Sequence, residues 1–214
     1  MTTPDCEICV EFEASHVPEH YLFRGVPEAG RVLAQTDEFV LVPDFAPMMP
    51  GHVLLFTRSH ALSMADHLRD GADDGELASV LERYSMFYGA LAVIEHGSTL
   101  EVERARPCIA HAHLHLLPLD ADPLIREFTR ESAQETTESA WPEIVRAAGH
   151  EYVLVGGGES VTMCVDWHPP ARQYARSLVG RVLGLLPPQT YSDVCIAPDL
   201  VSAIISEWSA DDAG

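Results

Sequence analysis

Three histidines stand at alternate positions in the segment His111–Leu117, with apolar residues between them. Successive side chains of a β-strand point to opposite faces, so His111, His113 and His115 would share one face of a strand. Imidazoles bind metal ions, exchange protons near neutral pH and act as nucleophiles. The pattern alone is compatible with a metal site, a nucleophilic site or a polar strand face that is exposed to solvent.

Attack on phosphorus is one reaction that suits this arrangement. A central imidazole such as His113 can attack through one ring nitrogen while a hydrogen bond to the other nitrogen fixes the tautomer and stabilises the developing charge. Flanking donors can neutralise the phosphoryl oxygens and protonate the leaving group.

The chain contains five cysteines, and two of them, Cys6 and Cys9, form a C-x-x-C pair. An odd number of cysteines behind an N-terminus with no secretory leader argues against a disulfide framework. The pair is typical of a redox dithiol or of half a metal site. The other three cysteines are expected to be small buried hydrophobic residues.

Acidic residues greatly outnumber basic ones, 33 against 13, and the formal net charge is −20. A surface this negative repels nucleic-acid backbones, so we expect no nucleic-acid partner. No apolar run is long enough to span a membrane. With no leader pattern either, we expect a cytoplasmic protein without a membrane partner.

The hydrophobic pattern predicts a mixture of strands and helices. Strands are expected at 31–34, 39–42, 52–57, 92–97, 109–119, 151–155 and 161–165, and helices at 76–91, 172–185 and 198–208. The segment 43–51 is rich in proline and glycine and is expected to be a turn joining an antiparallel pair. The segment 122–140 is expected to hold a short helix and a loosely ordered connection. Gly156–Gly158 has neither the lysine nor the following helix of a phosphate-binding loop, so it is expected to be a hairpin turn.

The triad resembles the signature of the histidine triad (HIT) family, in which three histidines alternate with apolar residues. A second family motif is matched upstream by Asp44, Pro47, Gly51, His52 and Leu54, with His60 after the strand. Together with the cysteine pair, the resemblance covers about residues 6–120. It implies an α+β fold with a five-stranded, mostly antiparallel sheet and a packed helix. We expect residues 1–120 to form this nucleotide-binding catalytic domain and residues 121–214 to form a C-terminal α/β extension packed on it.

The resemblance also implies roles for individual residues. His113 matches the nucleophile, which forms a nucleotidyl-histidine intermediate. His115 matches a residue that contacts the transferred phosphate, His111 matches the first triad histidine, and His52 resembles another histidine lining the phosphate site. Asp44 matches an acid that accepts hydrogen bonds from ribose hydroxyls, as a carboxylate can; it could also be a simple turn residue.

Some members of the family carry a structural zinc ion. The matching ligand positions here are Cys6, Cys9, His60 and His111, and two sulfurs with two nitrogens make an ordinary tetrahedral zinc set. Such an ion would fasten the N-terminus to the sheet beside the active site and give His111 a structural role. The alternative is an unmetallated dithiol.

The chain also departs from the common family pattern. The usual glycine, glutamine and serine or threonine ahead of the triad are replaced by Arg106-Pro107-Cys108, and the usual Asn-x-Gly reads Glu95-His96-Gly97. Proline has no amide side chain, so handling of the leaving group must differ, and Cys108 is retained as a candidate for the phosphate site. The chain most resembles a HIT branch with Glu-His-Gly, a cysteine before the triad, and His-Ala-His-Leu-His.

Several polar residues outside the motifs are further candidates. Arg104 or Arg106 could supply positive charge or could be solvated. Gln173 or Arg176 could reach the substrate in place of the missing glutamine, or their helix could simply pack on the sheet.

These features predict nucleotidyl hydrolysis or transfer at a nucleoside α-phosphate. Candidate substrates are dinucleoside polyphosphates, nucleoside phosphoramidates and acyl- or sugar-linked nucleotides, and the resemblance implies a homodimer. Two rival hypotheses stay open: a zinc-stabilised nucleotide-binding or scaffold protein with little turnover, and a metal-dependent hydrolase that uses the triad as ligands.

Overall fold

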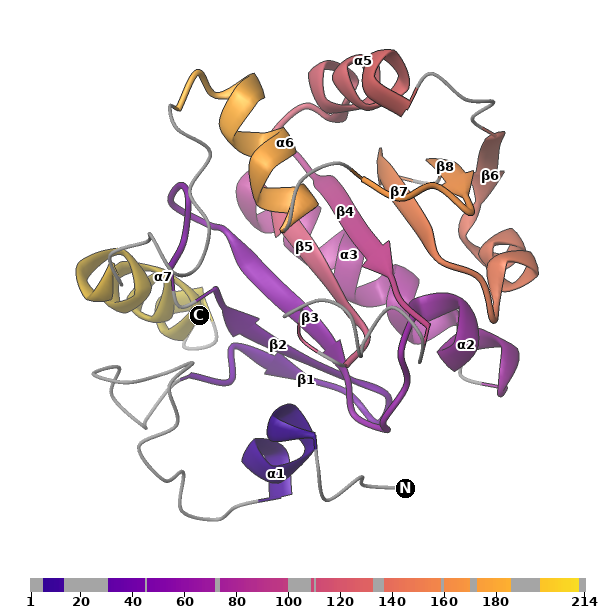
Figure 1. The fold of residues 1–214 in the computed structure, drawn as a ribbon. Coiled ribbons are helices and arrows are strands. Elements are labelled where there is room, and N and C mark those ends of the chain that lie inside the picture. Colours follow the sequence, from indigo (N-terminus) through magenta and orange to yellow (C-terminus); the bar gives the residue numbers. More distant parts are fainter. Residues whose placement is uncertain are drawn as a thin grey trace.

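The chain folds around an antiparallel sheet of eight strands in the order β1-β2-β3-β5-β4-β7-β8-β6 (Figure 1). The computed structural model describes residues 6–13, 31–44, 46–71, 74–99, 109, 111–132, 137–158, 160–169, 173–185 and 197–211. The strands are β1 (Ala34–Gln35), β2 (Phe39–Pro43), β3 (Val53–Thr57), β4 (Ala92–Gly97), β5 (His113–Leu117), β6 (Thr137–Ala140), β7 (Tyr152–Gly157) and β8 (Ser160–Val165).

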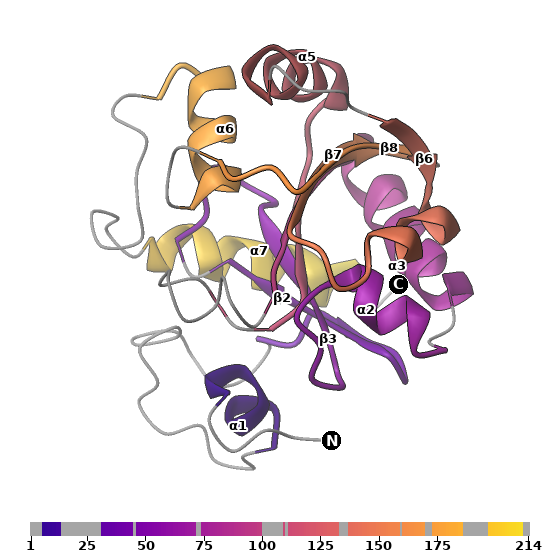
Figure 2. The ribbon, with the colours of Figure 1, turned by 45° about the vertical axis from the view of Figure 1, so that its right-hand side comes forward.

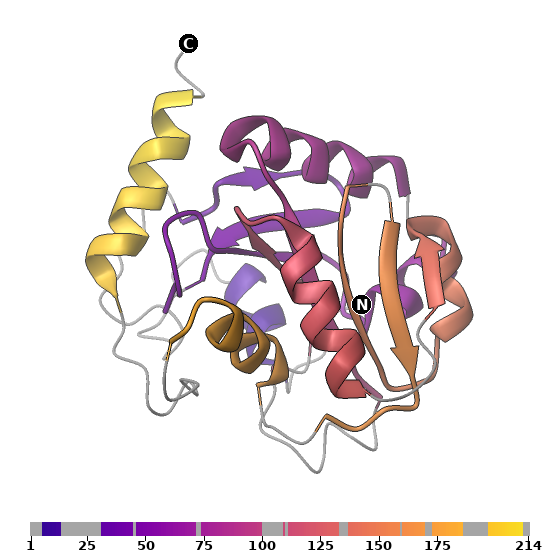
Figure 3. The same cartoon turned by 90° about the horizontal axis from the view of Figure 1, so that it is seen from above.

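Helices cover both faces of this sheet. The first face carries α2 (Met64–Arg69), α3 (Asp74–Tyr88), the 3₁₀ helix η2 (Trp141–Ala147) and α7 (Pro198–Asp211). The second face carries α1 (Glu7–Glu13), α5 (Ala121–Ser132) and α6 (Tyr174–Val182). Seen from above, α3 and α7 lie on one side and α5 and α6 on the other (Figure 3). Within the described part of the chain, no helix is both long and apolar enough to cross a membrane.

The core on the first face sets the orientation of the central strands. In α3, Leu77, Leu81 and Tyr84 recur at helical spacing and are buried. They belong to the same cluster as Leu55 of β3 and Leu114 of β5. Because strand side chains alternate, burying these leucines turns the neighbouring positions of β3 and β5 to the second face.

The second face carries His113 and His115 and is called the histidine face below. Over its β4–β7 half, Ile94 and Val153 pack with side chains of α5 and α6 such as Phe128 and Leu178. Over its β2–β3 half, an apolar cluster joins the strand residues to α1. Figure 2 shows α1 and α6 well apart from each other.

The α+β class predicted from the sequence is confirmed, but the sheet has eight strands rather than five. The five strands that precede residue 120 are contiguous, in the order β1-β2-β3-β5-β4. Strand β7 then pairs with the far edge of β4. The C-terminal segment therefore adds three strands to the same sheet.

Some predicted boundaries shift. The strand expected at 109–119 is limited to β5 and begins at His113, so His111 precedes it. Helix α2 was not predicted; its first turn is capped by the Ser63 side chain accepting from the Asp66 N–H at 3.1 Å. Helix α1 and strand β6 were not predicted.

The turn expected at 43–51 joins β2 and β3 and ends at Gly51. This residue has φ of +80°, and an added Cβ would lie 2.8 Å from a ring carbon of Tyr88. The Tyr84 hydroxyl donates to the Gly51 carbonyl at 2.8 Å. Glycine is required here because the backbone is left-handed and the neighbouring ring leaves no room. The turn therefore fixes the position of His52, the residue just before β3.

A buried acid ties the sheet to α2. Glu95 accepts hydrogen bonds from the Met64 N–H at 2.7 Å and from the Tyr152 hydroxyl at 2.5 Å. Its side chain lies on the face opposite His96, because adjacent strand residues alternate. Burial raises the pKa of Glu95 to about 8.

We expect Glu95 to make stability depend on pH. The folded state holds the Glu95 proton up to about pH 8, whereas an unpaired glutamate loses it near pH 4.5. The contribution is therefore complete below pH 4.5 and is lost as the pH rises through about 8, with a slope of at most about 1.4 kcal/mol per pH unit. Urea denaturation across this range should show a weaker decrease for Glu95→Gln than for wild type. Parallel curves for the two proteins would contradict the expectation.

Candidate functional site

Strand β5 positions His113 and His115 between two neighbouring strands. His115 is paired with Leu54 of β3 and Ile94 of β4, and His113 is paired with Phe56 of β3. The rings of His113 and His115 have centroids 5.3 Å apart. The two imidazoles therefore lie side by side on the histidine face.

One nitrogen of His113 is held by the backbone. Its Nδ1 lies 2.8 Å from the carbonyl oxygen of His111. A carbonyl only accepts, so Nδ1 carries the hydrogen and Nε2 keeps its lone pair. Burial lowers the pKa of His113, although the residue stays partly exposed. A neutral, oriented imidazole of this kind can attack an electrophilic centre.

A chain of hydrogen bonds sets the tautomers of His52 and His115. The Met48 N–H donates to Nδ1 of His52 at 3.2 Å, so a neutral His52 carries its hydrogen on Nε2. That Nε2 lies 3.0 Å from Nδ1 of His115. His115 therefore accepts at Nδ1 and carries its own hydrogen on Nε2. The result is an imidazole N–H donor beside His113.

A buried ion pair lies behind these two histidines. Asp44 is fully buried; its Oδ1 accepts from the Ala46 N–H at 2.8 Å, and its Oδ2 lies 3.3 Å from Nη1 of Arg176. The other Arg176 nitrogen, Nη2, donates to the Ala46 carbonyl at 2.8 Å. Oδ2 of Asp44 is also 3.4 Å from Nε2 of His52 and 3.9 Å from Nδ1 of His115. Helix α6 thus supplies a cation to the interior of the site.

The electrostatic environment keeps the site histidines uncharged. Burial, followed by the charge of Arg176, holds the pKa of His52 well below its ordinary value. Burial also holds the pKa of His115 well below its ordinary value, with smaller contributions from His52 and His113. Neutral imidazoles leave Arg176 as the cation that balances Asp44.

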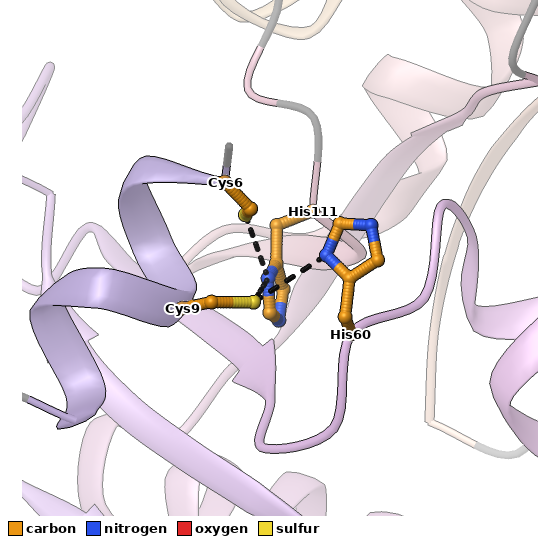
Figure 4. Close-up of side chains that lie close together, drawn as sticks. All are labelled: Cys6, Cys9, His60 and His111. Carbon is orange, nitrogen blue, oxygen red and sulfur yellow. Dashed lines mark hydrogen bonds between the residues drawn. The ribbon is translucent and has the colours of Figure 1, made fainter. Parts of the chain in front are cut away.

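Cys6, Cys9, His60 and His111 form a second group, with one potential ligand atom of each lying within 4.8 Å of the others (Figure 4). Nδ1 of His111 lies 3.4 Å from Sγ of Cys6 and 3.6 Å from Sγ of Cys9. Nδ1 of His60 lies 3.5 Å from Sγ of Cys9. The two cysteines are not joined in a disulfide. These four residues could hold a metal ion.

The orientation of His111 suits this group. Its Nε2 lies 2.7 Å from the carbonyl oxygen of Thr57, so Nε2 carries the hydrogen and the Nδ1 lone pair points toward the thiols. Burial lowers the pKa of His111 to about 4 and raises the pKa of the Cys6 thiol to about 11. Near neutral pH, His111 is therefore a neutral nitrogen donor.

The structure brings most of the predicted residues together in these two groups. Cys108 and the arginines Arg104 and Arg106 lie outside the described residues. Gln173 immediately precedes α6 with φ of 53°, and its side chain does not cap the helix. Thr57, whose carbonyl oxygen orients His111, was not predicted. Its position at the end of β3 indicates this role only when the β3–β5 pairing is known.

Comparisons with known proteins find similarity in solved structures only. A hypothetical histidine triad nucleotide-binding protein from Sulfolobus tokodaii is 22% identical, with a TM-score of 0.31, over 42% of this chain and 60% of that one. A Hit-like protein involved in cell-cycle regulation from Bartonella henselae is 18% identical, with a TM-score of 0.30, over 42% of this chain and 68% of that one. The chain therefore spans less than two thirds of the first of these proteins. No protein-family profile and no curated protein matches the sequence. The chain resembles histidine triad proteins over part of its length.

The Asp44–Arg176 pair generates a stability prediction. Arg176→Met removes the guanidinium charge that faces the buried Asp44 carboxylate, so we expect the free energy of unfolding to decrease by about 3–5 kcal/mol. Adding Asp44→Asn should recover part of this loss. Urea denaturation followed by circular dichroism measures both.

Arg181→Met is the matched control on the same helix. The Arg181 side chain is 28% exposed and pairs with Glu127 and Glu131, so its removal should cost about 1 kcal/mol or less. Equal decreases in the free energy of unfolding for the two arginine variants would show that the buried pair contributes no more than the exposed one.

Proposed function

We propose that the chain is a nucleotidyl hydrolase or transferase that acts at a nucleoside α-phosphate through a covalent intermediate on His113. The observation that carries this proposal is the hydrogen bond between Nδ1 of His113 and the His111 carbonyl, which leaves Nε2 available as the nucleophile. In the first step, Nε2 forms a bond to phosphorus and the leaving group departs. In the second step, water or another acceptor displaces the histidine.

The neighbouring groups support charge stabilisation at phosphorus. We propose that the Nε2–H of His115 donates to a phosphoryl oxygen, because its Nδ1 is occupied by His52. From the sequence, Asp44 is expected to accept ribose hydroxyls. Since its carboxylate is fully buried and bonded within the protein, the role we propose for it is to position His52 and His115. We keep Cys108 and Gln173 as candidates for contacts with the nucleotide.

We also propose a structural zinc ion at Cys6, Cys9, His60 and His111. Zinc–sulfur bonds of about 2.3 Å and zinc–nitrogen bonds of about 2.0–2.1 Å at tetrahedral angles place sulfur and nitrogen about 3.5 Å apart. The corresponding distances here are 3.4, 3.5 and 3.6 Å. Four protein ligands leave no open position for water, so this ion would stabilise the fold rather than activate a nucleophile.

The zinc proposal predicts a metal content that depends on the cysteine pair. Protein purified without chelator should contain about one equivalent of zinc per chain, whereas Cys6→Ser and Cys9→Ser should lose most of it and unfold at a lower temperature. Cys164→Ser is the control, because Cys164 is a buried cysteine outside any disulfide and belongs to another cluster. Elemental analysis with zinc titration measures this, and a wild type that neither contains nor takes up zinc would exclude the site.

The substrates we propose join a nucleoside α-phosphate to a leaving group: dinucleoside polyphosphates, nucleoside phosphoramidates, and acyl- or sugar-linked nucleotides. The acceptor defines the reaction class, since water gives a hydrolase, phosphate a phosphorylase and a sugar phosphate a transferase. A homodimer and a cytoplasmic location are proposed from the sequence reasoning alone.

Trapping the intermediate tests the central proposal. Wild-type protein is mixed briefly with a panel of adenylyl and guanylyl substrates, kept free of acid, and weighed intact by mass spectrometry. We expect a mass gain of one nucleotide that is absent in His113→Ala and present in His150→Ala, a surface histidine paired with Asp166. If folded protein shows no adduct and consumes no substrate across the panel, a nucleotide-binding or scaffold protein is favoured. Wild-type turnover that forms no adduct and stops on chelation would favour a metal-dependent hydrolase that uses the triad as ligands.

A further inference from the structure

A third group of ionisable side chains lies around the C-terminal end of β4 and has no role in the sites described so far. Nε2 of His96 lies 2.8 Å from Oε1 of Glu151, and Nδ1 of His168 contacts the other carboxylate oxygen. The Glu151 side chain is 3% exposed and that of His96 is 15% exposed, whereas that of His168 is 66% exposed. A buried carboxylate therefore orients a largely buried imidazole.

The direction of β4 carries His96 toward the end of β5 that holds His113. Ile94 of β4 is paired with His115 of β5, and because the strands are antiparallel, His96 lies two residues further along β4 in the direction of His113. On its other side, His96 is paired with Val153, whose side chain belongs to the apolar cluster on the histidine face. Cross-strand partners share a face, so His96 projects on the same side of the sheet as His113.

Electrostatics agree with this placement. Burial is the main cause that lowers the pKa of His113, and a positive charge on His96 adds to the lowering. The Nε2–H of His96 donates to Glu151, and an adjacent carboxylate stabilises an imidazolium. The His96 imidazole can therefore hold a second proton on the histidine face.

The proposed reaction needs such a proton. When a P–O or P–N bond breaks, the departing atom keeps the bonding electrons, and a poor leaving group departs slowly unless it is protonated. The glutamine that the resemblance places ahead of the triad is replaced by Pro107, which has no side-chain donor. His96 is an ionisable side chain among the described residues that could supply this proton.

We propose that His96, oriented by Glu151, is the acid that protonates the leaving group. This inference rests on the proposed function. His113 Nε2 forms the bond to phosphorus, the bond from phosphorus to the leaving atom breaks, and that atom takes the proton on Nδ1 of the His96 imidazolium. In hydrolysis, water then attacks phosphorus, the P–N bond to His113 breaks, and the proton released by water returns to His96. Glu151 orients His96 and takes no part in the proton transfer.

The test compares two leaving groups on one nucleotide. The phenolate of a p-nitrophenyl adenylate ester departs without a proton, whereas the amine of an adenosine 5′-phosphoramidate needs one. With the phosphoramidate, the single-turnover rate constant for forming the nucleotidyl-enzyme should be roughly 10²–10³-fold lower in His96→Gln than in wild type. With the p-nitrophenyl ester, the same rate constant should fall by less than about tenfold, because departure of this leaving group does not depend on the proton that His96 supplies.

Variants and controls separate this role from a structural one. Glu151→Gln keeps the imidazole but removes the charge that stabilises it, so it should show the same leaving-group dependence with a smaller loss. His150→Gln, which alters an exposed histidine–carboxylate pair, should leave both rates unchanged. Thermal unfolding reports whether each variant is folded, and an unfolded His96→Gln would be replaced by His96→Asn in the same comparison.

The outcomes distinguish this inference from the proposed function. If wild type forms the adduct and His96→Gln slows both substrates equally or neither, His96 is not the acid and the covalent mechanism stands. If wild type forms no adduct and consumes neither substrate, the proposed function fails and this inference fails with it.

Discussion

The pairing of β5 between β3 and β4 is the constraint on which the site depends. A shift of one residue in this register would turn His113 and His115 into the apolar core beneath α3 and bring leucines to the opposite face. The leucines of β5 oppose that shift because they are already packed there. The same packing that stabilises the sheet therefore orients the imidazoles, and the histidines need no separate scaffold.

The chain has a net charge of −20, and the buried charges of the site are balanced by their immediate neighbours. Asp44 is buried opposite Arg176, and the two histidines beside this pair have lowered pKa values. Under the proposed function, an anionic phosphate would approach a chain with 33 acidic and 13 basic residues and would be bound by fixed N–H donors. Neutral imidazoles whose tautomers are set by the backbone and by each other provide such donors without adding charge to the interior.

Residues within short motifs were predictable from the sequence, whereas contacts between distant segments were not. Alternation along 111–117 placed His113 and His115 on one face, and the C-x-x-C spacing identified the cysteines that lie near His111. The ion-pair partner of Asp44 is 132 residues away, and no local pattern selects Arg176 over another arginine. Likewise, the three added strands join the edge of β4 through long-range backbone pairing, and their hydrophobic pattern does not specify which edge they choose.

The contact between Asp44 and Arg176 has a consequence for the order in which the site can assemble. During synthesis, the triad, the cysteine pair and strands β1–β5 all emerge before α6. The Asp44 carboxylate then has no buried cation, and the β4 edge that later pairs with β7 is still open. Contacts across so large a sequence separation form late and slowly. The nascent chain would thus hold His113 on an unfinished sheet, and the proposed activity would require the last third of the sequence.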